Sequence, residues 1–182
     1  MITVDEFPFG APLDVCFAVA ADVERWPSIL PHYRHVRFLH RTGFAAGRVE
    51  MAAWRPFLGP VRYPTWWASD MSAEADTPII RFRHVDGITR GMDVRWEFFP
   101  TPAGTHVRIT HEWAGPHWPL VGVPVASRII GPHFISAIAR RTLAGLAAEA
   151  RARARDPDRQ RNRAPDRAPI RDDAPNPEPP RA

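Results

Sequence analysis

Two histidines of this sequence combine proton-transfer chemistry with an apolar setting. His111 lies in the stretch GTHVRITHEW and His84 in IIRFRHVD, and in both stretches the residues that share the histidine's side of the alternation are mostly apolar. Such alternation is typical of a half-buried strand. An imidazole titrates near neutral pH and can act as a general acid or base. A histidine on an apolar strand face is also a common core residue, so both interpretations remain open.

Tyr33 ends a second chemically suggestive stretch, DVERWPSILPHY at residues 22–33. Pro27 and Pro31 exclude one continuous helix here, because proline lacks an N–H and disfavours helix in the residue before it. The break carries two large aromatics, Trp26 and Tyr33. It is either a helix-to-strand corner with a hydrophobic plug or the rim of a ligand cavity.

Other chemical signatures are weak. His32 and His35 have a metal-like spacing, but no cysteine or HExxH partner accompanies them, so we expect no metal. The single cysteine, Cys16, excludes an intrachain disulfide and lies in an apolar helical run, which favours a core residue. The sequence has no glycine-rich phosphate loop, nucleophile elbow or paired carboxylates, and we expect no cofactor.

The hydrophobic pattern predicts one α+β domain. A strand at 1–9 precedes helical segments at 11–26 and up to 30, and a long helix begins near 125, where Pro132 implies a kink or a later start. Six further strands are predicted between them, at 33–42, 47–57, 61–76, 79–86, 91–100 and 104–115. We expect a curved antiparallel sheet of about seven strands wrapped around the last helix, with two short helices after the first strand and a pocket between sheet and helix.

Composition divides the chain at residue 150. Residues 1–150 contain 15 arginines and 14 acidic residues, whereas residues 151–182 contain nine arginines, six acidic residues, seven prolines and one large aliphatic residue. We therefore expect a ligand-binding domain at 1–150 and a disordered Arg/Pro-rich tail at 151–182. The nearly neutral domain argues against nucleic-acid binding. The opening MITVDEF is no secretory signal and no apolar run reaches membrane-spanning length, so a cytoplasmic protein is expected.

Two blocks connect this sequence to a known family. DVERWP followed by a strand, and MDVRWEFFPTPAGTHVRITHEW, resemble the SRPBCC superfamily of START-like, helix-grip proteins. Within it, the sequence is most similar to the polyketide cyclase/dehydrase group and to coenzyme-Q-binding START-like proteins, which are largely bacterial. The resemblance covers residues 2–150. It implies the fold described above, with the two short helices forming a V beneath the long one.

The resemblance also implies a cavity with specific residues. A tyrosine matching Tyr33 would line the pocket and position or protonate a poly-β-ketone, and His111 is the second candidate for moving protons. The related cyclases also use a pocket arginine, whose position falls near Ser69–Met71, where this sequence has none. The residues expected to bind ligand are Tyr33, Trp54, Trp67, Phe82, His84, Trp96, His111, Trp113, Phe134 and Ile138.

Three functions follow as hypotheses. The first is a cyclase or aromatase that folds a polyketide, held by an acyl carrier protein, and catalyses aldol addition and dehydration. The second is a non-catalytic carrier of a hydrophobic small molecule such as a quinone or lipid. The third is an interaction module whose Arg/Pro-rich tail docks a partner. A large apolar cavity without an ionisable pair favours the carrier, and a filled cavity favours the interaction module.

Overall fold

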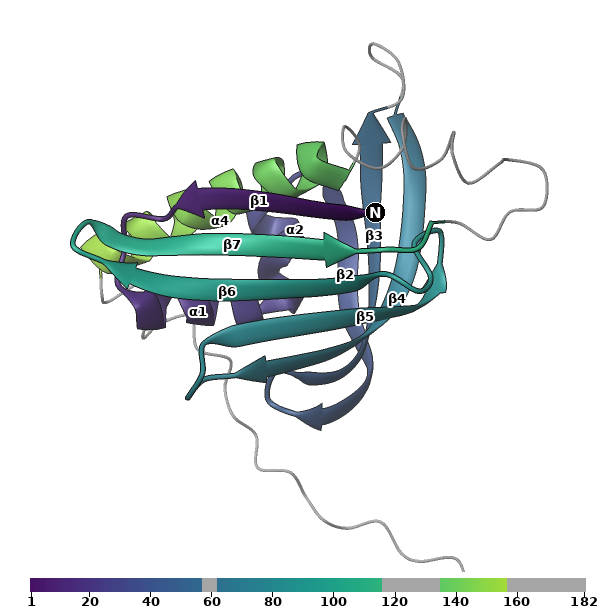
Figure 1. The fold of residues 1–182 in the computed structure, drawn as a ribbon, viewed down its shortest axis with the longest axis horizontal. Helices are drawn as coiled ribbons and strands as arrows, with labels where there is room; N and C mark the ends of the chain where they lie inside the picture. The colour runs from purple at the N-terminus through teal and green to yellow at the C-terminus, as the bar shows by residue number, and fades with distance from the viewer. Residues whose placement is uncertain (57–61, 116–134, 157–182) are drawn as a thin grey trace, which may run out of the picture.

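The computed structural model describes residues 1–56, 62–115 and 135–156. Its elements follow the predicted order (Figure 1): β1 (Ile2–Pro8), α1 (Leu13–Ala21), η1 (Val23–Arg25), α2 (Trp26–Ile29), β2 (Tyr33–Gly43), β3 (Ala46–Pro56), β4 (Arg62–Glu74), β5 (Ile79–Gly87), β6 (Asp93–Thr101), β7 (Gly104–Glu112) and α4 (Ser136–Arg155). The predicted α+β fold, a curved antiparallel sheet with a long C-terminal helix, is confirmed.

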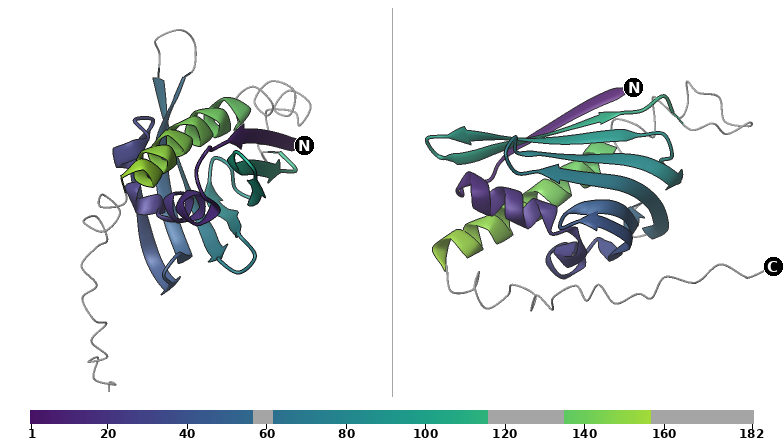
Figure 2. Two further views of the ribbon diagram at one scale, coloured as in Figure 1. Left: turned by 90° about the vertical axis from the view of Figure 1, so that its left-hand side faces the viewer. Right: turned by 90° about the horizontal axis from the view of Figure 1, so that it is seen from below.

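The seven strands form one antiparallel sheet in the order β1-β7-β6-β5-β4-β3-β2. The sheet curls so strongly that β3 and β4 stand upright in Figure 1 while β5, β6 and β7 run across the view. Figure 2 shows α4 and α1 on the inner side of this curl. The pairing of β4 with β5 begins only at Trp67 and shifts register between Ala68 and Ser69. Pro64 therefore lies where β4 has only β3 as a neighbour, which is compatible with its missing N–H.

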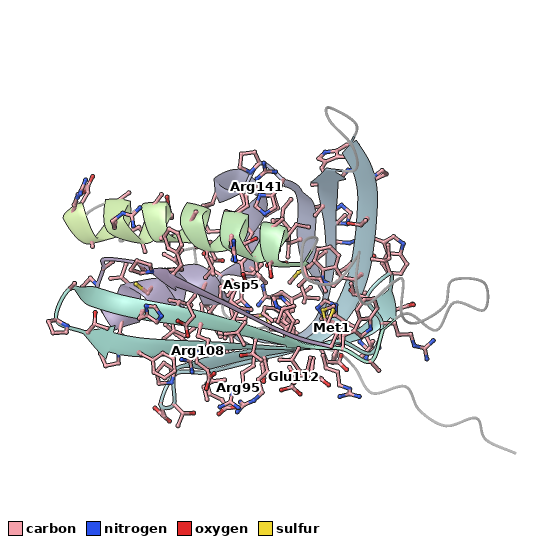
Figure 3. All side chains as sticks on the ribbon, turned by 45° about the horizontal axis from the view of Figure 1, so that its top comes forward. Met1, Asp5, Arg95, Arg108, Glu112 and Arg141 are labelled. Atoms are coloured by element: carbon pink, nitrogen blue, oxygen red, sulfur yellow. The ribbon has the colours of Figure 1, made fainter. Side chains whose placement is uncertain are left out.

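The alternation predicted for β6 and β7 agrees with the side-chain burial. Val94, Trp96 and Phe98 of β6 are buried, as are Val107 and Ile109 of β7. The core between the sheet and α4 is completed by two fully buried leucines of the helix, Leu143 and Leu146. The opposite face of the sheet is charged: Figure 3 shows Arg95, Arg108 and Glu112 on the side away from α4.

Strand β1 presents its faces in a way that its apolar residues do not indicate. Ile2 and Val4 are 68% and 54% exposed, whereas Thr3 and Asp5 are buried. The cause is the register with β7, which places Thr3 opposite the inward-facing His111 and Asp5 opposite Ile109. Asp5 faces α4 (Figure 3) and accepts a hydrogen bond from Arg140 Nε at 3.1 Å.

Helix α4 extends beyond the domain boundary expected at residue 150, because it continues to Arg155. Its last turns are attached to the domain by Arg151, whose Nη1 donates a hydrogen bond to the Phe9 carbonyl at 3.0 Å. Within the helix, Arg153 Nε donates to Glu149 at 2.9 Å. The helix start expected near residue 125 lies outside the described residues, and so does the tail from residue 157. Within the described helices, none has the length and apolarity that a membrane span requires.

Candidate ligand cavity

A small cavity lies between the curled sheet and α4, with a volume of about 70 Å³. Pockets for drug-sized ligands typically measure roughly 300–1,000 Å³. The wall is mostly apolar: side chains from α2, from β2 through β7 and from α4 contribute to it, among them Met51, Met92, Ile109 and Ile138. Because the two methionines are unbranched and flexible, they are the parts of the wall that can move most readily to admit a larger ligand.

Five aromatic side chains make up much of this wall: Trp26, Tyr33, Trp67, Phe82 and Trp96. The Trp26 ring packs against three of the others, with centroid distances of 5.2 Å to Tyr33, 6.3 Å to Phe82 and 5.6 Å to Trp96. Such contacts stabilise the wall and offer flat surfaces to a planar ligand. The Trp26 Nε1–H is buried and has no hydrogen-bond partner among the described residues, so it is a donor suited to a ligand oxygen.

Tyr33 reaches the cavity because the proline break ends the helical segment just before it. Its backbone N–H donates to the Leu30 carbonyl at 2.9 Å, and β2 begins at Tyr33 itself. The side chain is 8% exposed and packs between His32, at a centroid distance of 4.8 Å, and Trp67, at 6.2 Å. The segment is thus both a packed corner and a part of the cavity wall.

Three histidines near the cavity each contact a threonine hydroxyl. His84 Nδ1 lies 2.6 Å from Thr89 Oγ1, and His111 Nδ1 lies 3.4 Å from Thr3 Oγ1. The third pair joins His32 Nε2 to Thr142 Oγ1 of α4 at 3.0 Å. His84, His111, Thr89 and Thr142 belong to the wall. These contacts restrain the imidazole rings, and the hydroxyl can serve as donor or acceptor to either tautomer.

No arginine, lysine, aspartate or glutamate lies among the described residues of the wall. At the place where the family resemblance implies an arginine, Ser69 is fully buried and its Oγ has no hydrogen-bond partner among the residues that the structure covers. The described wall therefore presents neutral hydroxyls, an indole N–H and imidazoles rather than a permanent charge. Such a wall favours an uncharged ligand, since a buried ion without a partner is costly.

Of the residues expected to bind ligand, seven lie on the wall: Tyr33, Trp67, Phe82, His84, Trp96, His111 and Ile138. Trp54 does not belong to it; the side chain is half-buried and stacks with Arg34, whose guanidinium carbon lies 4.7 Å from the ring centroid. Trp113 is buried, but its Nε1–H donates to the Arg90 carbonyl at 3.0 Å and the residue is not part of the wall. Phe134 lies outside the described residues.

The structure adds wall residues that the sequence did not single out for binding, above all Trp26, Thr89 and Thr142. Trp26 sits within the proline break that drew attention to Tyr33, so that signal was available. Thr89 and Thr142 carry no signal in the sequence, because their role depends on histidines brought close by the fold. Cys16 takes no part: it is fully buried, and burial raises the pKa of its thiol, which makes it a poor nucleophile.

No metal site is evident in the part of the cavity that the structure describes. Among the described residues, no cluster of three or more histidine, cysteine, aspartate or glutamate side chains could hold a metal ion. His32 and His35, which have a metal-like spacing in the sequence, diverge: His32 is buried against Thr142, whereas His35 is exposed and contacts Glu50 at 3.1 Å.

The fold is a seven-stranded antiparallel sheet curled around a C-terminal helix, with short helices after β1 and a cavity between the layers. This arrangement defines the START-like, helix-grip class. Residues 9–129 match the family described as polyketide cyclase / dehydrase and lipid transport. The chain belongs to that family.

Curated relatives agree with this assignment, and solved structures share the fold. A putative polyketide cyclase of Streptomyces halstedii is 30% identical over 108 residues, which is 58% of this chain and 94% of the relative, and one of Streptomyces cyaneus is 28% identical over 115 residues, 62% and 72%. The Zhui aromatase/cyclase from Streptomyces sp. R1128 superposes with a TM-score of 0.66 at 20% identity, covering 86% of this chain and 97% of the other. A START superfamily protein from Mycobacterium smegmatis gives 0.57 at 14% identity, covering 85% and 96%.

Proposed function

We propose that this protein binds a hydrophobic, aromatic or polyketide-like molecule in the cavity and catalyses its aldol cyclisation and dehydration. The observation that carries the proposal is the wall itself, where aromatic side chains surround a space that also presents one tyrosine and two histidines. The family, whose curated Streptomyces relatives are putative polyketide cyclases, supports the same reaction class.

The reaction needs no cofactor or oxidant. A base removes a proton from a carbon between two carbonyls, and the resulting enolate carbon forms a new carbon–carbon bond to a ketone carbon of the same chain. The ketone oxygen takes up a proton and becomes a hydroxyl, which then leaves as one molecule of water when a neighbouring carbon loses its proton. Holding both reacting carbons in one narrow cavity supplies much of the rate, because the step becomes a positioned intramolecular one.

Tyr33 and His111 are the side chains that we assign to proton transfer. The Tyr33 hydroxyl donates to the ketone oxygen as negative charge develops there, and the His111 imidazole accepts the proton from carbon. The flat faces of Trp26, Trp67 and Trp96 keep the chain folded. With no arginine among the described wall residues, stabilisation of the enolate relies on neutral donors such as the Trp26 N–H.

The size of the cavity limits how the substrate enters. About 70 Å³ holds no multi-ring molecule without movement of the wall. Binding of a polyketide therefore displaces wall side chains, with Met51 and Met92 as the most adaptable. An acyl carrier protein that delivers the substrate as a thioester, in the cytoplasm, is part of this proposal.

A carrier of a hydrophobic small molecule is the second candidate, and the absence of charged residues from the described wall is the observation that favours it. The experiment that separates the two supplies the protein with a poly-β-ketone thioester mimic and follows the products by liquid chromatography and mass spectrometry. A cyclase releases a product that has lost one water, whereas a carrier binds the compound unchanged.

Native mass spectrometry of the purified chain provides the complementary measurement. A co-purified aromatic molecule without turnover supports the carrier. If the protein neither binds nor converts any compound of a hydrophobic panel, both candidates are excluded and the interaction module remains.

A further inference from the structure

The turn between β5 and β6 is held by several backbone hydrogen bonds. The backbone N–H of His84 donates to the Met92 carbonyl at 2.8 Å, and the N–H of Gly91 donates back to the His84 carbonyl at 2.9 Å. Inside this closed loop, the Met92 N–H also donates to the Thr89 carbonyl at 3.1 Å. These bonds hold Thr89 at a set position relative to His84.

Contacts on two sides hold the same turn in place. Gly87 has a φ of +86° and its backbone lies so close to β4 that an added Cβ would stand 2.4 Å from the Trp66 carbonyl oxygen. This position therefore requires glycine. From the residue that follows β7, the indole N–H of Trp113 donates to the Arg90 carbonyl at 3.0 Å. Trp113, expected to touch the ligand, instead supports the turn.

The fixed turn orients one imidazole at the cavity. Thr89 Oγ1 contacts His84 Nδ1 at 2.6 Å, and the Trp67 indole stacks on the ring at a centroid distance of 5.9 Å and an interplanar angle of 18°. His84 is thus held at its edge by a hydroxyl and on its face by an indole. His84, Thr89 and Trp67 all belong to the cavity wall.

An oriented imidazole in an apolar wall suits a particular ligand chemistry. A neutral imidazole has one donor and one acceptor nitrogen, and a phenol or enol hydroxyl can both donate and accept. A ligand hydroxyl buried in this wall without such a partner would cost binding free energy. The Tyr33 hydroxyl and the His111 imidazole are further neutral groups of the described wall. His84 is distinguished by the hydroxyl at its ring edge and the indole stacked on its ring face.

We propose that His84 is the specificity-determining residue that recognises a phenolic or enolic hydroxyl of the ligand, and that Thr89 and Trp113 are positioning residues that act through it. The proposal rests on the proposed function insofar as the cavity must bind an aromatic or polyketide-like molecule. It adds the functional group of the ligand that the cavity selects, a hydroxyl, and the side chain that recognises this group.

Phenol and toluene test the proposal, because they have nearly the same shape and differ by a hydroxyl in place of a methyl group. A single ring also suits the small cavity. The dissociation constants of both are measured on the full chain by NMR titration, and the ratio of the toluene constant to the phenol constant reports the preference for the hydroxyl. His84→Phe should lower this ratio roughly two- to tenfold, the value of one net hydrogen bond, while toluene affinity stays within about twofold.

The positioning residues are tested with conservative variants. Thr89→Val and Trp113→Phe should each lower the ratio in the same direction, and Thr89→Ser should restore it. In the wild-type chain, phenol but not toluene should shift the side-chain nitrogen resonances of His84, and Thr89→Val should weaken that shift. Thr105→Val is the matched control: Thr105 is a buried threonine whose hydroxyl donates to the Ala11 carbonyl at 2.9 Å, and it does not belong to the wall. That variant should keep the wild-type ratio even if it unfolds at a lower temperature.

The outcomes distinguish a failure of the proposed function from a failure of the role proposed for His84. If neither ligand binds the wild-type chain, the cavity is not an aromatic site and the proposed function fails. If both bind and the ratio is the same in wild type and His84→Phe, the role of His84 is refuted while the proposed function stands. If Trp113→Phe weakens both ligands equally, Trp113 does not act through His84. Toluene binding shows in each variant that the cavity has kept its shape.

Discussion

Replacing Tyr33 by phenylalanine removes one hydroxyl and leaves the cavity wall in place. The Tyr33 ring contacts His32, Trp26 and Trp67 at centroid distances of 4.8, 5.2 and 6.2 Å, and a phenylalanine ring can make all of these contacts. The change in stability is therefore limited to one net hydrogen bond, about 0.5–1.5 kcal/mol. For a domain of this size, that corresponds to a fall in Tm of about 1–6 °C.

The effect on function depends on which candidate is correct. If the hydroxyl donates a proton or a hydrogen bond to the ketone oxygen in the transition state, turnover falls by about 10² or more while substrate binding changes little. If the protein is a carrier, the same substitution weakens binding by about 0.5–1.5 kcal/mol and there is no turnover to lose. The two results differ in kind as well as in size.

The assay combines single-turnover kinetics on a poly-β-ketone thioester mimic with a binding titration followed by tryptophan fluorescence. Trp26 and Trp67 flank Tyr33, so ligand binding should quench their emission saturably. Tyr33→Leu is the comparison variant: it loses three aromatic contacts, roughly 1.5–4.5 kcal/mol, and should lower both stability and binding. Turnover by Tyr33→Phe at the wild-type rate would refute a role for the hydroxyl in catalysis.

Four further predictions concern stability and reactivity. Gly145→Ala should lower the free energy of unfolding in urea by up to about 2 kcal/mol. An added Cβ would lie 2.3 Å from Cδ2 of the buried Leu30, and the overpacking of about 1–3 kcal/mol is set against about 1 kcal/mol gained in helix propensity. A more stable variant would show that the Leu30 side chain moves aside freely. Burial raises the pKa of Cys16, so Ellman's reagent should label this thiol at pH 8 only as fast as the protein unfolds, and rapid labelling of the native chain would contradict the buried position. Burial also raises the pKa of the Asp22 carboxyl. The stability that this group contributes is therefore present below its unfolded-state pKa and is lost as the pH rises through its folded-state pKa. Asp22→Asn should gain in Tm relative to wild type between pH 3.5 and 7, and a Tm difference that stays constant over this range would argue against the raised pKa. Truncation after Arg155 should leave Tm within about 2 °C, since the removed residues carry little apolar surface; a loss of ten degrees would show that they pack on the domain.

Much of the fold was predictable because it depends on local pattern. The alternation in residues 91–100 and 104–115 fixes which side chains face the core, since successive side chains of a strand point to opposite faces. Pro31 predicts where the helical segment ends before β2, whereas Pro27 lies in the first turn of α2, where its missing N–H is tolerated. Tyr33, His84 and His111 could be selected as cavity candidates from these patterns together with the resemblance to a known family.

The sequence could not determine what depends on distant partners. Ile2 and Val4 of β1 face solvent because pairing with β7 sets the register, and a one-residue difference in register exchanges the two faces of a strand. Trp54 and Trp113 are as aromatic as Trp67, yet only Trp67 belongs to the cavity wall; the position of each relative to the curl of the sheet decides this. The contact of His84 with Thr89, and the support of that turn by Trp113, arise only when β5, β6 and β7 lie side by side, because hydrogen bonds act over a few ångströms in space regardless of separation along the chain.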